Sequence, residues 1–316
     1  MEQEQTKQDE MNPIIIENLY KSYGKVTAVN GVSLEVRPSE IFGLIGPDGA
    51  GKTTIIRIIV SLLNPDKGQV LFKGTPVAGN MSFVRAQVGY MPQRFSLYQD
   101  LTVEENLDFF GDLFKVPKDI QTKRKNHLYE FSRLGTFRSR RAGALSGGMK
   151  QKLALSCMLM HEPDVIVLDE PTFGVDPVSR SEFWEILNSL AKKGASILVT
   201  TAYMDEAALC DRVAFIYNGR ILGMDSPEKL SSSIRDSIYV VHSDSPHLLF
   251  EAITKSGRFK TCELFGDGVH LTDSDGAGIE TIKDILNTLN ATYHKIKKIE
   301  PGLEDVFLKL MNEASQ

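Results

Sequence analysis

The sequence predicts an α/β protein with a mostly parallel sheet, followed by a small α+β domain. The strand-sized apolar run Ile41 to Ile45 leads through a glycine-rich turn into a helical pattern, as a parallel α/β unit begins. Strand-like runs and helical segments then alternate as far as Tyr217. Beyond a serine-rich stretch, the order of the elements is βαββαβ. Together these patterns predict two domains.

The N-terminal region is rich in short β-type runs. Residues 1–12 are dominated by Glu, Gln, Lys and Asp, and they predict a disordered tail. Runs at 14–17, 31–36 and 41–45, separated by Gly, Pro and Asn turns, predict an antiparallel β region leading into the sheet. After Gly51 the isoleucines and leucines of residues 55–63 line one face of a helix that we expect to end at Asn64-Pro65.

The middle of the chain predicts a helical insertion and then the rest of the sheet. Residues from about 95 to 145 have helical periodicity and no strong strand pattern. Strand-like runs return at 165–168, 196–200 and 212–217, with a helix at 178–192 between the first two. This alternation predicts that the parallel sheet closes there.

The remaining residues predict a second domain. We expect the first domain to cover 13–230, a linker to lie near Ser226 to Ser233, and an accessory domain to cover 236–316. The split βαββαβ order there is typical of a ferredoxin-like fold. Its expected strands are 237–242, 260–265, 269–272 and 295–299, and its expected helices are 248–255, 278–289 and a final helix at 303–311.

Bulk composition excludes several classes of protein. With 42% hydrophobic and 24% charged residues, the chain has the composition of a globular protein. Its longest apolar runs are strand-sized and its N-terminus lacks a secretory signal, so we expect a cytoplasmic protein that does not span a membrane. A net charge of -5 argues against a nucleic-acid partner. The three cysteines lack metal-ligand spacing and are expected to be reduced thiols.

The turn after residue 45 matches the phosphate-binding pattern G-x-x-x-x-G-K-[ST] and lies between a predicted strand and helix. Backbone N–H groups of such a loop turn toward phosphate, Lys52 neutralises phosphate oxygens, and the Thr53 hydroxyl ligates Mg²⁺. The expected ATP-binding residues of the loop are Gly46, Pro47, Asp48, Gly49, Ala50, Gly51, Lys52, Thr53 and Thr54.

Two adjacent carboxylates follow the apolar strand at 165–168. An apolar run offers no packing reason for either Asp169 or Glu170 at its end. We therefore expect Asp169 to hold Mg²⁺ and Glu170 to polarise the attacking water as a catalytic base, together with Lys52. A phosphate loop and an acidic strand define only some P-loop NTPase, for which we expect a RecA-like core.

A third motif narrows the class. In Leu145-Ser146-Gly147-Gly148-Met149-Lys150-Gln151, Ser146, Gly147 and Gly148 stand at a helix start, which is an anion site. This segment resembles the LSGGQ signature of ABC transporter ATPases, with Met149 in place of Gln. The resemblance implies that the signature completes the ATP site of an opposite subunit. It thus implies a head-to-tail dimer with two sandwiched ATP molecules and a second, identical ATPase subunit.

Further positions fit the same family. Tyr23 resembles the aromatic residue that stacks on adenine, although a tyrosine at a strand end is more often a packing residue. Gln93 resembles the glutamine that contacts Mg²⁺ and water, which makes it a metal and catalytic candidate. Asp176 resembles an aspartate that takes part in ATP binding, and it also suits a helix N-cap followed by Pro177.

One position departs from the family. Where the family has a His that donates to the γ-phosphate, this sequence has Ala202 after Thr201. Loss of such a donor typically costs about 10² to 10³ in rate. Three interpretations follow: a natural variant with slow or differently assisted hydrolysis, an engineered trap, or a nucleotide-driven clamp or regulatory subunit. We favour the natural variant, because the surrounding residues resemble those of some drug-export ATPases. Tyr203 is a candidate for part of the missing role.

Three segments indicate which kind of ABC transporter ATPase this is. They are Asp48, the residues around Gln93 and the ending Pro301 to Phe307. These resemble bacterial multidrug and antibiotic-efflux exporter ATPases. The resemblance implies an integral membrane permease as partner, allows a periplasmic adaptor, and implies a location at the cytoplasmic face of the inner membrane. A soluble ABC protein of ribosomes or DNA is the alternative, but such proteins usually join two ATPase units. A groove for the permease is expected from Phe95, Leu97, Tyr98, Phe109 and Phe110.

Overall fold

The structure is a computed structural model that describes residues 11–94, 97–234, 236–259, 261–265, 268–273 and 278–315. It divides into two compact units, the first ending at Pro227 and the second beginning at Glu228. Of the expected tail at 1–12, only Met11 and Asn12 are among the described residues. No helix in these ranges is long and apolar enough to cross a bilayer.

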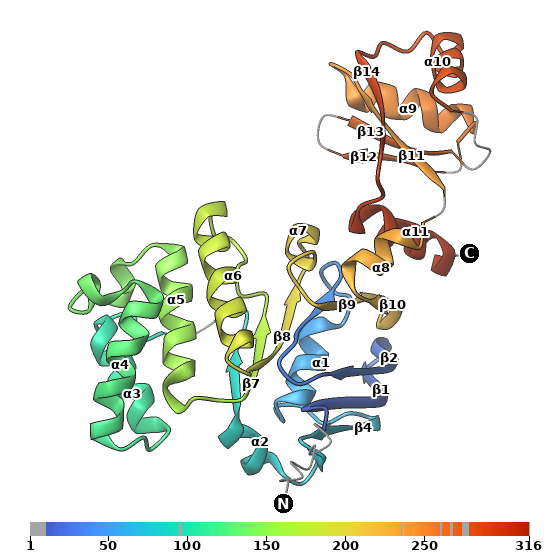
Figure 1. The fold of residues 1–316 in the computed structure, drawn as a ribbon. Helices are drawn as coiled ribbons and strands as arrows, with labels where there is room; N and C mark the ends of the chain where they lie inside the picture. Colours follow the sequence, from blue (N-terminus) through green and yellow to red (C-terminus); the bar gives the residue numbers. More distant parts are fainter. Residues whose placement is uncertain are drawn as a thin grey trace, which may run out of the picture. The chain divides into compact units, whose positions relative to one another are not determined.

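The first unit contains two sheets (Figure 1). The smaller sheet is antiparallel, in the order β2-β1-β4-β5. The larger has the order β10-β9-β3-β8-β7-β6, with parallel neighbours from β9 to β6 and an antiparallel edge strand β10. The strands are β1 (Ile14–Tyr23), β2 (Val26–Val36), β3 (Ile41–Ile45), β4 (Lys67–Phe72), β5 (Thr75–Pro76), β6 (Val88–Met91), β7 (Val165–Asp169), β8 (Ser196–Thr201), β9 (Arg212–Tyr217) and β10 (Arg220–Asp225).

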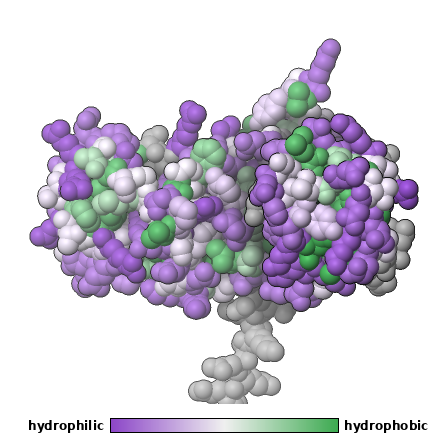
Figure 2. Space-filling model, turned by 90° about the horizontal axis from the view of Figure 1, so that it is seen from above, coloured by the Kyte–Doolittle hydropathy of each residue, from purple (hydrophilic) through white to green (hydrophobic). Residues whose placement is uncertain are grey.

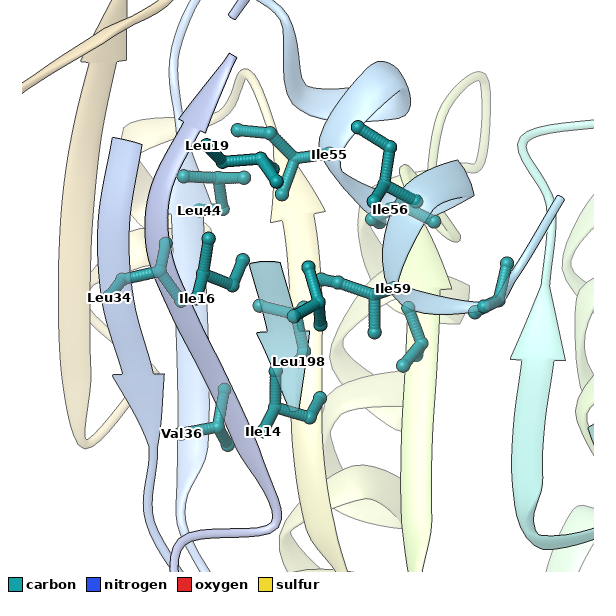
Figure 3. Close-up of a cluster of buried hydrophobic side chains, with 14 of the residues drawn as sticks. Ile14, Ile16, Leu19, Leu34, Val36, Leu44, Ile55, Ile56, Ile59 and Leu198 are labelled. Atoms are coloured by element: carbon teal, nitrogen blue, oxygen red, sulfur yellow. The ribbon is translucent and has the colours of Figure 1, made fainter. Parts of the chain in front are cut away.

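Helix α1 (Lys52–Ile59) packs its apolar side chains into a core that both sheets share (Figure 3). Ile55, Ile56 and Ile59 are fully buried, as the helical spacing predicts. They lie in one cluster with Leu19 of β1 and Leu198 of β8. This core fixes the start of α1 at the end of β3.

The helical insertion and the remaining helices flank the larger sheet (Figure 1). Thr102 begins the insertion with a capping box, because its side chain accepts from the N–H of Glu105 while Glu105 bonds back to Thr102. Besides α1 and short 3₁₀ turns, the described helices of this unit are α2 (Met81–Gln87), α3 (Val103–Leu113), α4 (Lys118–Ser132), α5 (Gly147–Met158), α6 (Pro177–Lys192) and α7 (Met204–Ala207).

Several local features differ from the sequence expectation. Helix α1 ends at Ile59 instead of Asn64, and Ser61 has a φ of 60° in the left-handed region. Strands β4 and β6 were not expected. The first half of β4 is exposed and polar, and β6 has four residues, so neither shows a long periodic pattern. Helix α8 (Pro227–Ser232) occupies the stretch expected to be a linker.

The second unit is a ferredoxin-like domain, as predicted. Its antiparallel sheet has the order β12-β13-β11-β14, which places the first and third strands of the βαββαβ order at the centre. Helices α9 and α10 contribute to its separate core. The elements are β11 (Ser237–His242), α9 (Pro246–Ser256), β12 (Thr261–Phe265), β13 (Gly268–Asp273), α10 (Gly278–Thr288), β14 (Lys295–Ile299) and α11 (Leu303–Ser315).

The surface is mainly hydrophilic on the face that Figure 2 shows, and hydrophobic residues gather there in small separate patches. Such patches are ordinary on a folded domain, because part of every surface is apolar. The fold class expected from the sequence, an α/β first unit and a small α+β second unit, is confirmed by the two sheet topologies.

Candidate functional site

The phosphate loop connects the end of β3 to the start of α1. Gly51 precedes the helix with a φ of 108°, and a Cβ there would lie 2.3 Å from the carbonyl oxygen of Ala28. A Cβ at Gly46 would lie 2.2 Å from the carbonyl oxygen of Ile216. Side chains at either position would collide with backbone. The loop therefore needs glycine at both positions for steric reasons.

The first turn of α1 offers backbone donors. The first helical hydrogen bond runs from the N–H of Ile55 to the carbonyl of Gly51, at 3.1 Å. The N–H groups of Lys52, Thr53 and Thr54 precede it and have no acceptor within the helix. Together with the positive end of the helix dipole, they form an anion site.

The Lys52 side chain is buried at the centre of the site, with an exposed fraction of 4%. Its ammonium donates to the carbonyl oxygens of Gly46 at 2.6 Å and Pro47 at 3.1 Å. It also lies 3.0 Å from Oε1 of Glu170. The contacts join the phosphate loop to the end of β7, so the two motifs predicted separately from sequence form one cluster.

Asp169 accepts two hydroxyl hydrogen bonds on one oxygen. Thr53 donates to its Oδ1 at 3.2 Å and Thr200 donates to the same atom at 2.8 Å. Burial raises the pKa of Asp169, and the two hydroxyl donors only partly offset this effect. A divalent cation beside Asp169 and the Thr53 hydroxyl would compensate the buried charge, and oxygen ligands of this kind suit Mg²⁺.

Glu170 adopts an uncommon backbone conformation, with a φ of 48°. Its N–H donates to the carbonyl oxygen of Thr200 at 3.1 Å and to the Thr200 hydroxyl at 3.0 Å. Its carboxylate is buried, faces Lys52 through Oε1, and accepts from Nε2 of Gln93 at 2.9 Å through Oε2. The surrounding contacts thus hold a strained residue in place, as is common at functional sites.

A cavity of about 170 Å³ adjoins this cluster. Asp48, Glu170 and Ala202 line it, and the Ala202 methyl group brings no polar atom to its wall. Tyr203, also at the cavity, donates its N–H to the Thr201 hydroxyl at 3.0 Å. The Tyr203 ring lies 4.7 Å from the guanidinium of Arg180, which supports a packing role for that ring. The further lining residues are Thr172, Phe173 and Thr201.

The signature residues and Asp176 form a second cluster. The Ser146 hydroxyl caps α5 by accepting the N–H of Met149 at 3.3 Å. A Cβ at Gly148 would lie 2.4 Å from Ser179, whose N–H donates to Asp176 at 2.9 Å. Hydrogen bonds from the N–H and the hydroxyl of Ser179 lower the pKa of Asp176. Ser146, Gly147 and Asp176 are exposed, and among the described residues no hydrogen bond or ion pair joins them to the phosphate loop.

Tyr23 lies apart from both clusters, at the end of β1. Its side chain is 48% exposed, and Nζ of Lys21 lies 6.0 Å from the ring centroid. Within the described residues, its observed contacts do not reach the phosphate loop. With about half of the side chain open to solvent, packing does not fully account for the ring.

The expected permease groove is partly described. Phe95 lies outside the described residues. Leu97 is buried, whereas Tyr98 and Phe109 are exposed, and their ring centroids lie 4.5 Å apart. Leu97 shares a cavity of about 230 Å³ with Gln93 and Gly147. This cavity places the glutamine beside the start of α5.

Thr200 is the residue of the site that sequence reasoning missed. It donates to Asp169 and accepts from the N–H of Glu170, so it connects both acids. The parallel register pairs Asp169 of β7 with Thr200 of β8. The available signal was a pair of threonines ending an otherwise apolar strand at the same edge as the acids.

Known proteins resemble the chain at three levels. A family profile described as "ABC transporter" matches residues 29–173. The chain is 42% identical over 214 residues to "Probable multidrug ABC transporter ATP-binding protein YbhF" of Escherichia coli K12, a match that covers 68% of the chain and 37% of that relative. It is 37% identical over 306 residues to "Nod factor export ATP-binding protein I" of Burkholderia lata, covering 96% of the chain and 98% of the relative.

A solved structure extends the comparison to the fold. The ADP conformation of MJ1267, an ATP-binding cassette of an ABC transporter, matches with a TM-score of 0.63 and 28% identity over 69% of this chain and 92% of that one. The chain therefore spans little more than a third of YbhF, but nearly the full length of the Burkholderia protein.

Proposed function

The chain belongs to the ABC transporter family as an ATP-binding ATPase subunit of the exporter type, and from this premise we propose that it powers a separate membrane permease as a head-to-tail dimer. One observation carries the proposal. The phosphate loop and the two acids of β7 form one cluster, while the signature residues lie in another. One subunit therefore supplies two different halves of an ATP site.

In the first cluster, different residues bind the phosphate, the metal ion and the attacking water. Lys52 binds phosphate oxygens through its ammonium, and the N–H groups at the start of α1 add donors. Asp169, Thr53 and Gln93 would hold Mg²⁺, which would neutralise charge on the phosphate oxygens. Glu170 accepts the proton of the attacking water as general base. The Lys52–Glu170 distance of 3.0 Å supports a shared role, because a phosphate that draws the ammonium away leaves the carboxylate free to accept a proton.

Tyr23 completes the nucleotide site in this proposal by stacking on adenine. Its exposed ring supports the role, because an aromatic face left open to solvent is available to a flat base. The proposal assigns ATP and Mg²⁺ as substrate and cofactor. It places the protein at the cytoplasmic face of the inner membrane through the permease.

The dimer is supported by what flanks Asp176. Phe173 is 58% exposed and Val178 is 71% exposed, so two large apolar side chains lie open to solvent on either side of the exposed Asp176. Ser146 and Gly147 are exposed as well. A second copy of the chain seated there would cover the apolar side chains and bring its phosphate loop to the Ser146 helix start.

Complementation between two inactive variants tests the dimer. Lys52→Ala disables the phosphate loop and Ser146→Arg disables the signature, so either homodimer has two broken sites. In a head-to-tail heterodimer one site is doubly broken and the other is intact. An equimolar mixture should therefore recover about a quarter of the wild-type turnover if subunits pair at random. Turnover that stays at the level of the separate variants would overturn the composite site.

The permease is proposed to dock on an exposed aromatic surface of the helical insertion, defined by Tyr98 and Phe109. Both rings are exposed and contact each other, and Tyr98 directly follows Leu97, which lines a cavity together with Gln93. Charged substitutions Tyr98→Glu and Phe109→Glu should release the chain from permease-containing membranes while basal ATP turnover persists. The control is Leu248→Glu, which changes an exposed apolar residue of α9 in the second unit. Equal retention of all variants would exclude this surface.

A second candidate function is a nucleotide-driven clamp or regulatory subunit with little hydrolysis. Ala202 favours it, because no side-chain donor extends from that position into the cavity beside Glu170. Turnover measured with the permease in membranes separates the two functions. A rate of ATP turnover that matches the rate of transport supports the ATP-driven exporter. Transport or gating that persists without phosphate release supports the clamp or regulatory subunit.

A further inference from the structure

A larger cavity lies in the first unit and includes none of the residues predicted for ATP binding. It is lined by α4, by the end of α6 and by the segment that leads into β7. Its volume of about 520 Å³ falls within the roughly 300–1,000 Å³ typical of small-molecule sites. Neither the ATPase activity nor the family motifs account for this cavity.

The floor and one wall of the cavity are apolar. Leu128, Leu159 and Leu190 contribute aliphatic surface, and Leu128 and Leu159 are buried. The rings of His127 and Phe131 stand one helical turn apart on α4, with centroids at 6.1 Å and planes within 18° of each other. This wall is suited to a flat aromatic or other apolar body.

The acidic side chains at the cavity are already matched. Glu162 pairs with Arg124, whose Nη1 also donates to the carbonyl oxygen of Met160 at 2.8 Å. Asp164 lies 2.7 Å from Nζ of Lys73, outside the cavity. Both carboxylates therefore have a cation of their own.

Two lysines at the cavity, Lys193 and Lys123, have no carboxylate partner among the described residues. Nζ of Lys193 lies 3.4 Å from Nε2 of His127 and 5.5 Å from the Phe131 ring centroid. In the described part of the chain, neither Lys193 nor Lys123 forms an ion pair with a carboxylate. Among the described residues, the cavity thus presents two ammonium groups without a carboxylate partner, and that of Lys193 lies directly against the His127–Phe131 wall.

We propose that this cavity is a binding site for an amphipathic anion, a small molecule with a flat apolar body and one sulfonate, carboxylate or phosphate group. The body lies against the His127–Phe131 wall and the leucine floor, where burial of apolar surface stabilises it. The anionic group lies toward Lys193 and Lys123. A single ligand must carry both features to use the whole cavity. A neutral apolar molecule would make no ion pair with the ammonium groups, and a simple anion would bury no apolar surface.

The probe for the test is 8-anilino-1-naphthalenesulfonate, an aromatic sulfonate whose fluorescence increases in an apolar environment. Its neutral counterpart, N-phenyl-1-naphthylamine, has the same rings without the sulfonate. The chain has one tryptophan, Trp184, which is buried in α6. It lies about 9 Å along the helix axis from Leu190, at about 1.5 Å per residue. Energy transfer from Trp184 to the bound sulfonate is therefore expected.

Variants then locate the probe. Lys193→Gln and Lys123→Gln should each weaken sulfonate binding about two- to fivefold, as loss of one exposed charge pair does. Phe131→Ala should weaken both probes. The matched control is Lys192→Gln, a neighbouring exposed lysine that does not line the cavity. Affinity for the sulfonate should also fall as salt concentration rises.

Each outcome bears on the proposal. Binding that depends on Lys193 and Lys123 but not on Lys192, that persists with saturating MgATP, and that exceeds binding of the neutral amine supports it. No sulfonate binding, equal affinity for both probes, or insensitivity to the two cavity lysines overturns it. Displacement by MgATP would assign the probe to the nucleotide site instead and overturn it as well. Because none of these outcomes depends on hydrolysis, the result is independent of the proposed motor function.

Discussion

The substitution Glu170→Gln tests the proposed mechanism most directly. Glu170 is 6% exposed, its Oε1 lies 3.0 Å from Nζ of Lys52, and its Oε2 accepts from Gln93. The amide keeps the size and most of the hydrogen bonding but cannot accept a proton as the carboxylate does. Loss of a general base lowers turnover about 10² to 10⁴-fold, which corresponds to about 3 to 5 kcal/mol of activation free energy.

The same substitution also has a stability effect that must be separated from the chemical one. Lys52 is buried and, among the described residues, pairs with the Glu170 carboxylate alone. Leaving its ammonium with carbonyl acceptors only should lower the free energy of unfolding by about 1 to 3 kcal/mol. Phosphate release at saturating MgATP should therefore be normalised to the folded fraction from thermal unfolding, and nucleotide binding measured in parallel.

Glu40→Gln is the matched control. Glu40 is 7% exposed, and its Oε1 lies 3.1 Å from Nη1 of Arg212, but it precedes β3 and so stands at the opposite end of that strand from the phosphate loop. It should lose a comparable amount of stability with turnover per folded molecule within about twofold of wild type. If Glu170→Gln also retained turnover within about twofold while binding ATP, Glu170 would not be the base.

Three further changes have expected outcomes. Ala202→His should raise turnover up to about 10²-fold by restoring a hydrogen-bond donor beside the γ-phosphate. The control Ala208→His, at an exposed position four residues beyond the start of α7, should leave turnover unchanged. No gain from either substitution would show that the missing donor at position 202 does not limit the rate. In chemical denaturation, Gly51→Ala should lower the free energy of unfolding by about 1 to 3 kcal/mol more than Gly79→Ala does. Both glycines have a positive φ, but only Gly51 lacks space for a Cβ. Equal losses would contradict the close approach of Gly51 to the Ala28 carbonyl. Because burial raises the pKa of Asp169, the folded protein binds its proton more tightly than the unfolded chain, so stability falls as pH rises through the range between the ordinary and the raised pKa and stays lower above it. Asp169→Asn should therefore raise the unfolding midpoint near neutral pH in Mg²⁺-free buffer and flatten this acid dependence, although it should abolish Mg²⁺-dependent turnover; a lower midpoint would refute the burial argument.

Local patterns were enough for much of the fold. The strand, turn and helix around the phosphate loop are contiguous in the chain, so their order alone predicts how Gly46 to Thr54 are placed. The ferredoxin-like order of the second unit was readable for the same reason, because each element carries its own periodicity. Strands β4 and β6 escaped detection because their stability comes from neighbouring strands instead of from a pattern of their own.

What the sequence determined by itself is chemical identity: a phosphate loop, two acids, a signature and an alanine at the position of a histidine. Tertiary structure alone decided which of these meet. Sheet register places Thr200 beside Asp169, and the neighbouring pairing of β6 with β7 brings Gln93 to Glu170. Only the fold separates the signature residues from the phosphate loop and assembles Lys123 of α4 and Lys193, just beyond the end of α6, around one cavity. The reason is physical: these contacts join residues far apart in sequence, and their geometry depends on packing that no local pattern encodes.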